Sequence, residues 1–134
     1  MKATDLMIGD KVMVKVLSQI PNTYVLHTWT ANDYSRDIQV KPIPLTPEIL
    51  EKNGFYDRNT QWYYKKFLSN GCYDIAISLV YREIEVSKLS GVGTECEEVE
   101  YDSAIVFDND ICVHELQHAL RLCVLNELAD NFKV

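Results

Sequence analysis

Apolar and polar side chains alternate strictly in the segment KVMVKV, which directly follows Gly9-Asp10. The three valines of this segment fall on one face of an extended chain, so the pattern predicts a strand with one buried side. Turn-forming dipeptides at Pro21-Asn22 and Asn32-Asp33 divide the sequence that follows into two further strands. We predict these strands at about Thr23 to Trp29 and Asp37 to Lys41.

The pattern Leu-x-x-Gly-Asp-x-Val that leads into these strands is similar to the opening of an SH3-like barrel. Residues 1–45 are few for a complete barrel of this kind. We therefore expect strands from later in the chain to complete the N-terminal sheet.

The segment PLTPEILEKNGF carries the signals of a short helix. It predicts a helix from Pro47 to Asn53, because Thr46 is a good N-cap and proline suits the first helical position. Gly54 can adopt the left-handed conformation that ends many helices. In such a Schellman ending the side chains of Leu50 and Phe55 form an apolar pair.

Strand signals dominate the sequence after this helix. The aromatic segment Gln61 to Leu68 indicates a strand, Asn70-Gly71 predicts a hairpin turn, and residues 72–89 return as one long or broken strand. Within this segment YREIEV alternates, with Glu83 and Glu85 on one side, which predicts one wet face. The acidic run ECEEVEYD predicts a solvated edge strand, whose charges deter pairing with other chains. Trp62, Tyr63 and Tyr64 could form a binding surface. Alternation places Trp62 and Tyr64 on one face of the strand and Tyr63 on the other, so we expect at least one of these faces to be core.

The final helix is predicted from about Cys112 to Leu128, with Asp110 as its N-cap. It contains the pattern HELQH, in which His114 and His118 lie one turn apart. Two imidazoles with this spacing can bind one zinc ion, and Glu115 between them could act as general base on a zinc-bound water. The pattern is therefore a candidate for a zinc-dependent hydrolase.

A third zinc ligand is missing from the spacings that zinc peptidases use. The extended motif of one group requires Gly at Arg121 and His at Val124, and neither is present. Glu127 and Asp130 follow the motif too closely to reach back from a later helix. Other potential ligands lie at no defensible spacing: His27, Asp108, Asp110 and Cys112. We therefore predict no catalytic residue and no metal site, and interpret HELQH as the face of a structural helix, with zinc as the alternative.

Composition and charge bound the possible functions. The 134 residues, 47% of them hydrophobic, suffice for one domain over 1–134, with possible sub-lobes 1–45 and 46–134. The formal net charge of −7 and the scattered lysines and arginines argue against direct nucleic-acid binding. No apolar run is long enough to cross a membrane and no leader begins the chain. We expect a cytoplasmic protein whose four cysteines stay reduced.

Three segments, MKATDLMIGD, PIPLTPEILEKNGF and VHELQHALRLC, resemble a family of small uncharacterised proteins of gut anaerobic bacteria and of their phages and mobile elements. In that family the last segment often takes the form His-x-Leu-Gln-Asn, which matches His114, Leu116 and Gln117. The two positions that differ carry the general base and the second histidine of a zinc peptidase, so the resemblance implies a structural helix. Cys112 departs from the family, in which an aromatic residue is common at this position.

We predict an α+β protein, an antiparallel sheet or meander with SH3-like N-terminal strands, one short central helix and one C-terminal helix. The resemblance implies a non-enzymatic protein of phage or mobile-element type. It would act through contacts with a protein partner, without a cofactor, a membrane or direct contact with nucleic acid. Two alternatives stay open: a zinc-dependent hydrolase that uses HELQH, and an acidic inhibitor that imitates nucleic acid and binds a basic partner through carboxylates on one face.

Overall fold

The structure is a computed structural model that describes most of the chain. The described residues are 1–2, 5–16, 23–36, 38–57, 60–68, 71–90 and 98–134. They form two compact units. The first unit combines residues 1–44 with 112–132 and 134, and the second comprises residues 45–111 with 133. The C-terminal segment thus folds with the N-terminal strands, whereas the sub-lobes considered from the sequence placed it within residues 46–134.

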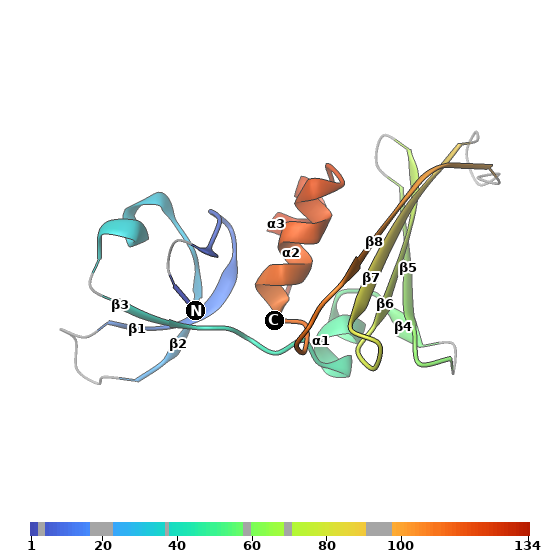
Figure 1. Cartoon of the computed structure of the whole chain (residues 1–134). Coiled ribbons are helices and arrows are strands. Elements are labelled where there is room, and N and C mark those ends of the chain that lie inside the picture. Colours follow the sequence, from blue (N-terminus) through green and yellow to red (C-terminus); the bar gives the residue numbers. More distant parts are fainter. Residues whose placement is uncertain (3–4, 17–22, 37, 58–59, 69–70, 91–97) are drawn as a thin grey trace. The chain divides into compact units, whose positions relative to one another are not determined.

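A three-stranded antiparallel sheet forms the N-terminal part of the first unit (Figure 1). Strand β1 (Lys11–Val16) lies between β2 (Val25–Thr28) and β3 (Ile38–Lys41). The predicted alternation is confirmed, because Val12 and Val14 are buried and their neighbours in the strand are half-buried. The core cluster of this sheet consists of Leu6, Val12, Val14 and Trp29.

The expectation that later strands complete this sheet is wrong for the part of the chain that the structure describes. The strands that follow, β4 to β8, form a sheet of their own. They do so as a meander, in which each strand pairs with its neighbour in the sequence. A short 3-10 helix, η2 (Ala31–Ser35), connects β2 to β3 within the first unit. The SH3-like barrel stays a prediction.

The second unit is built on a five-stranded antiparallel sheet whose strands follow chain order, as the predicted meander requires (Figure 1). It comprises β4 (Tyr56–Asp57), β5 (Tyr63–Leu68), β6 (Cys72–Ser78), β7 (Glu83–Ser90) and β8 (Glu98–Val106). The pairing of Leu68 with Cys72 confirms the hairpin at Gly71, although Asn70 lies outside the described residues. Strand β8 lies at the sheet edge, as the acidic run predicts, and residues 95–97 of that run also lie outside the description.

The two faces of this sheet differ in burial. One face carries apolar side chains that are at most 2% exposed: Ile75, Ile77, Ile84 and Val86. On the same side, Lys65 Nζ donates a 2.6 Å hydrogen bond to the carbonyl oxygen of Asn53, the C-cap of helix α1 (Pro47–Lys52). On the opposite face, the described side chains in the middle of the sheet are half-buried or exposed, among them Tyr64, Asp74 and Glu85, so this part of the face is open to solvent. Cys72 and Ser78, at the two ends of β6, are buried on that side.

Helix α1 begins and ends as the sequence predicts. Thr46 is its N-cap, and the side-chain oxygen of Thr46 accepts a 3.3 Å hydrogen bond from the N–H of Ile49. Gly54 has a φ of 85°, and the N–H of Phe55 donates to the carbonyl oxygen of Leu50 over 3.0 Å. The helix therefore ends in the predicted Schellman motif.

The prediction of one continuous C-terminal helix is wrong. Helix α2 (Val113–Leu122) ends in a second Schellman motif, and α3 (Asn126–Asp130) follows it. Val124 has a φ of 63°, and the N–H of Leu125 donates to the carbonyl oxygen of Leu120 over 2.9 Å. Valine stands where glycine is usual, so the sequence contains no recognisable stop signal at this point.

The predicted N-cap of the C-terminal helix is also wrong. Cys112 is the N-cap, and its N–H donates a 2.9 Å hydrogen bond to Oε1 of Glu115 in the first turn. Asp110 instead accepts a 3.2 Å hydrogen bond from Arg82. A glutamate at the third helical position can therefore cap this helix without the usual serine or threonine ahead of it.

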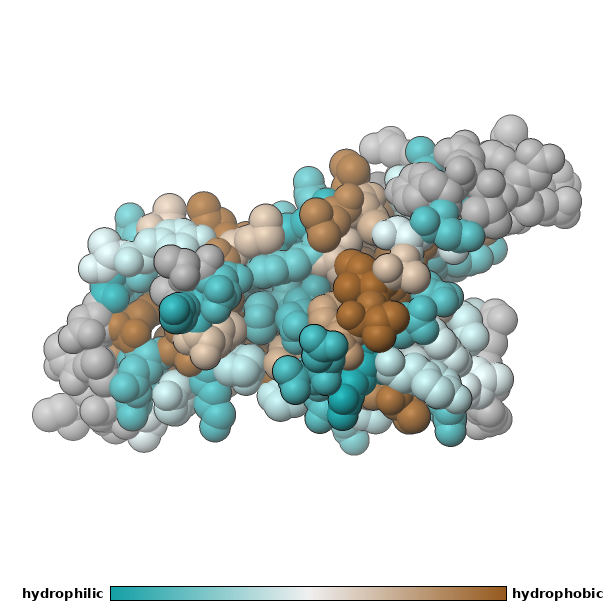
Figure 2. Space-filling model, viewed as in Figure 1, coloured by the Kyte–Doolittle hydropathy of each residue, from teal (hydrophilic) through white to brown (hydrophobic). Residues whose placement is uncertain are grey.

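The fold class is α+β, as predicted, with two antiparallel sheets and short helices. None of the helices in the described part of the chain has the length and apolar character needed to cross a bilayer. On the side of the molecule that Figure 2 shows, apolar side chains form separate patches within a largely hydrophilic surface.

Candidate functional site

The HELQH segment lies in helix α2 of the first unit. Leu116 is fully buried, and the rings of His114 and His118 lie together, with centroids 5.5 Å apart and an interplanar angle of 80°. The predicted proximity of the two imidazoles is therefore confirmed. What the motif can do depends on which atoms its polar side chains bind.

Asp10, in the turn ahead of β1, is the main partner of the motif. Its side chain is 0% exposed, and its Oδ2 lies 2.5 Å from Nε2 of His118 and 2.8 Å from the N–H of Met7. Arg121 donates to Oδ1 over 2.5 Å. Burial alone would raise the pKa of Asp10, but these hydrogen bonds outweigh it and hold the pKa below its usual value. Asp10 is therefore a buried carboxylate with bonds to both of its oxygens.

Gly9 makes room for this arrangement. It has a φ of 95°, and a Cβ atom at this position would lie 2.8 Å from a guanidinium nitrogen of Arg121. Arg121 also donates to Asp130 of α3 over 3.3 Å. The turn ahead of β1 thus needs glycine both for its backbone conformation and for the close approach of the arginine.

Gln117 provides a second tie between the same turn and helix α2. Its side chain is 0% exposed, and its Oε1 accepts a 2.8 Å hydrogen bond from the N–H of Lys11. Its Nε2 donates to the carbonyl oxygens of Gly9, over 3.0 Å, and Ala129, over 2.9 Å. We call the side chains of Asp10, Gln117, His118 and Arg121 the buried clasp. It joins β1, α2 and α3, which come from the two ends of the chain.

His114 is the member of the motif whose role the hydrogen bonds do not explain. Its side chain is buried, and among the described residues its Nδ1 has no hydrogen-bond partner. Burial lowers the pKa of His114 below its usual value, and the neighbouring His118 lowers it further. His114 is therefore held in its neutral form around neutral pH.

The motif offers zinc only part of a site. Nε2 of His118 holds Asp10, and the described residues contain no group of three histidine, cysteine, aspartate or glutamate side chains that could hold a metal. One upstream candidate, His27, is bonded to Asp33 over 2.7 Å. To bind zinc through Nε2, His118 would have to leave a buried carboxylate, which is costly.

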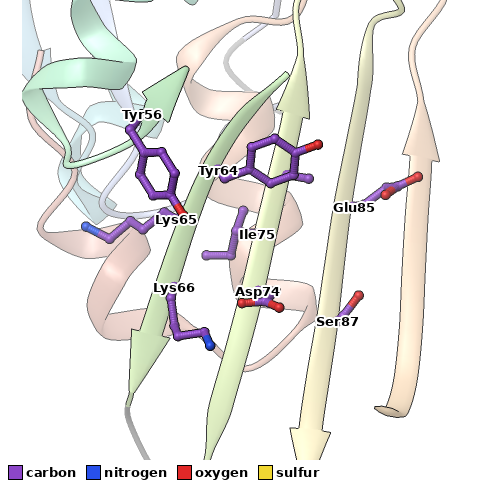
Figure 3. A pocket seen from close by; sticks show the side chains of 9 residues that line it. Tyr56, Tyr64, Lys65, Lys66, Asp74, Ile75, Glu85 and Ser87 are labelled. Atoms are coloured by element: carbon purple, nitrogen blue, oxygen red, sulfur yellow. The ribbon is translucent and has the colours of Figure 1, made fainter. Parts of the chain in front are cut away.

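A second candidate site lies on the open face of the five-stranded sheet in the second unit (Figure 3). The strand register places two rows of side chains across β5 to β8. The first row is Tyr64, Ala76, Glu85 and Ala104, and the second is Lys66, Asp74, Ser87 and Asp102. Tyr56 on β4 pairs with Tyr64 and extends the first row.

Two cavities lie on this face. The first, of about 420 Å³, is lined among others by Tyr56, Tyr64 and Asp74, and the second, of about 340 Å³, by Asp102 and its neighbours on β8. Glu85 and Ser87 line both cavities. We call Tyr56, Tyr64, Asp74, Glu85 and Asp102 the carboxylate–tyrosine face. Trp62, Tyr63 and Tyr64 are all half-buried, and Tyr64 borders a cavity that is open to solvent (Figure 3), so the side of β5 that carries Tyr64 is not core.

Outside HELQH, the sequence pointed to Tyr64 as a possible binding-surface residue and placed Asp102 in an acidic run, but it did not group them into a site. Asp10 carries only a turn signal in the sequence, and its partner His118 is 108 residues away. The alternation in YREIEV correctly places Glu85 on a wet face, but only the strand register brings it beside Tyr64.

Comparison with known proteins adds no relative. No protein-family model matches the chain, and no curated protein or solved structure matches it either. The resemblance to a family of small proteins of gut anaerobic bacteria and of their phages and mobile elements therefore stays a prediction.

Proposed function

We propose that the protein is a non-enzymatic protein of phage or mobile-element type that acts through contacts with a protein partner. In this proposal HELQH holds the first unit together and performs no catalysis. The hydrogen bond between Nε2 of His118 and the buried carboxylate of Asp10 carries the proposal.

The other polar residues of the motif support the same interpretation. Glu115, the residue that would act as general base, accepts a hydrogen bond from the N–H of Cys112 and caps α2. The side-chain amide of Gln117 makes three hydrogen bonds, which tie α2 to the turn before β1, to Lys11 and to α3. A general base must reach the water it activates, and in this structure Oε1 of Glu115 is engaged at the helix N-terminus.

The binding half of the proposal rests on the second unit. Its open sheet face has two adjoining cavities, and its charged and aromatic side chains stand on the solvent side. Concave surfaces that combine aromatic and polar side chains are common binding sites. A second candidate function, the acidic inhibitor that imitates nucleic acid, is favoured by the carboxylates of Asp74, Glu85 and Asp102 on this one face.

The metal content of the protein tests the proposal that HELQH is structural and not a zinc site. Untagged protein purified without chelator is analysed for zinc, together with His118→Asn and, as the matched control, His27→Gln. We expect no stoichiometric zinc in any of the three proteins, and a folded His118→Asn variant of reduced stability. About one zinc per chain in the wild type and the control, lost in His118→Asn, would overturn the proposal in favour of the hydrolase.

A further inference from the structure

The carboxylate–tyrosine face carries an excess of negative charge. Glu83 lies two residues before Glu85 on β7 and therefore on the same side of the sheet. The two rows contain one cationic side chain, Lys66, which lines the first cavity, and the carboxylates of Asp74, Glu85 and Asp102. Glu83 adds a fourth carboxylate to this side of the sheet. Lys65 also lines the first cavity, but its Nζ bonds the carbonyl oxygen of Asn53 on the other side of β5.

The pKa of Glu85 reflects this excess of negative charge. Partial burial raises the pKa of Glu85 above its usual value, and the neighbouring carboxylates of Glu83 and Asp102 raise it further. The carboxylates on this face therefore repel one another. A cation between them would remove that repulsion, so the face is complementary to positive charge.

The tyrosines at one end of the face add a second feature that suits a cation. The rings of Tyr56 and Tyr64 have centroids 6.4 Å apart and an interplanar angle of 39°. Both side chains border the first cavity, beside Asp74 (Figure 3). Aromatic ring faces attract ammonium and guanidinium groups, and this attraction adds to that of a nearby carboxylate.

The two adjoining cavities suit an extended chain. The two cavities adjoin, because Glu85 and Ser87 line both of them. Alternate side chains of an extended peptide point to the same side and lie roughly 7 Å apart. Two such side chains could therefore enter the two cavities from one segment of a partner.

We propose that the carboxylate–tyrosine face binds an extended segment of a partner protein that carries alternate lysine or arginine side chains. This inference rests on the proposed function, and it names the chemistry of the partner. One basic side chain would lie in the first cavity beside Tyr56, Tyr64 and Asp74, and the next would lie between Glu85 and Asp102.

The test uses the whole chain labelled with ¹⁵N and two synthetic peptides of equal length. One peptide alternates lysine with threonine, and the other alternates glutamate with threonine. Two-dimensional NMR at low salt gives both the affinity and the residues whose amide signals move. We expect the lysine peptide to shift amides of β5 to β8, and the glutamate peptide to leave them unchanged. Binding of the lysine peptide is expected to weaken as salt is raised, since exposed charges are screened.

Matched double variants separate a site from general attraction to an acidic protein. Asp74→Asn/Glu85→Gln removes two charges from the face, and Asp108→Asn/Glu127→Gln removes two exposed charges elsewhere. We expect the first variant to bind the lysine peptide about fivefold more weakly and the second to bind it within about twofold of wild type. Tyr56→Leu tests the aromatic contribution and is expected to weaken binding about threefold. Because these side chains are not in the core, the variants should remain folded, which circular dichroism checks.

Four results would overturn the inference. Equal weakening in the two double variants would show general charge attraction without a site. Amide shifts confined to the first unit would place binding elsewhere. Spermidine binding to the same residues as tightly as the peptide would indicate a site for small cations. Self-association through this face without any peptide would indicate a second copy as the occupant. Each of these would leave the metal-content test of the proposed function unaffected, so the two proposals can fail separately.

Discussion

Nε2 of His118 lies 2.5 Å from Oδ2 of Asp10, although 108 residues separate them in the sequence. This hydrogen bond joins the turn before β1 to helix α2, and Arg121 reinforces it on the other carboxylate oxygen. The second histidine of HELQH is thus part of the structure that holds the two ends of the chain together. A buried carboxylate with several partners is expensive to disturb, since removal of one partner leaves charge without compensation.

Gln117 should be as important to stability as the charged members of the buried clasp. Gln117→Leu removes three hydrogen bonds and leaves the N–H of Lys11 and the carbonyl oxygens of Gly9 and Ala129 to find other partners. We expect the free energy of unfolding to fall by about 3 kcal/mol. Denaturant unfolding measures this loss. Gln39→Leu, at an exposed position of β3, is the control and should change stability by less than about 0.5 kcal/mol. Equal effects of the two substitutions would contradict the role given to Gln117.

The left-handed valine at the end of α2 predicts a stabilising substitution. Val124 has a φ of 63° and a side chain that is 77% exposed, so little packing offsets the strain of a β-branched residue in this conformation. Val124→Gly should raise the free energy of unfolding by about 1 kcal/mol. Leu122→Gly is a matched control, because Leu122 is similarly exposed but helical. It should lower stability by about 1 kcal/mol. If both glycine variants were destabilised, the end of α2 would not be strained.

Comparison of the two Schellman motifs explains which parts of the fold the sequence could reveal. Both helices end with the same hydrogen-bond pattern, but the left-handed residue is Gly54 in one and Val124 in the other. Glycine adopts this conformation at no steric cost and therefore signals the helix end, whereas valine favours other conformations. The end of α1 was accordingly predicted, and the break after α2 was not.

Interactions between distant residues limited the prediction of the sites. Alternation correctly predicted the buried valines of β1 and the wet side of β7, because the period of a strand is a local property. The partnership of Asp10 with His118 and the row that joins Tyr64 to Glu85 depend on how strands and helices meet. No local sequence pattern predicts these contacts between residues that are distant in the chain.

His114 predicts a loss of stability in mild acid. The unfolded chain takes up a proton on this side chain near the usual pKa of 6.5, whereas in the folded protein burial and His118 lower the pKa of His114. Below pH 6.5 the unfolded state therefore binds more protons, and the free energy of unfolding falls as the pH falls. Glu115, Asp10 and Asp5 act in the opposite direction and reduce this effect without reversing it.

Denaturant unfolding at pH 8.0, 6.5 and 5.5 measures this dependence. These pH values lie above the pKa of Asp10, which is held below its usual value. The wild type should lose stability between pH 6.5 and 5.5, by at most about 1.4 kcal/mol per pH unit for one proton. His114→Leu should flatten the curve in this range, and His27→Gln should leave the fall in place. A curve for His114→Leu that runs parallel to that of the wild type would assign the acid sensitivity to another group.

The most direct test of the account is a double-mutant cycle between Asp10 and His118, because their hydrogen bond decides between a structural and a catalytic HELQH. The free energy of unfolding is measured at pH 7.5 for the wild type, Asp10→Asn, His118→Gln and the double variant. We expect a coupling free energy of at least about 1 kcal/mol, with Asp10→Asn the more damaging single change because Arg121 also binds this carboxylate. A coupling within about 0.3 kcal/mol of zero would mean that His118 does not support Asp10, and that the motif is free for another purpose.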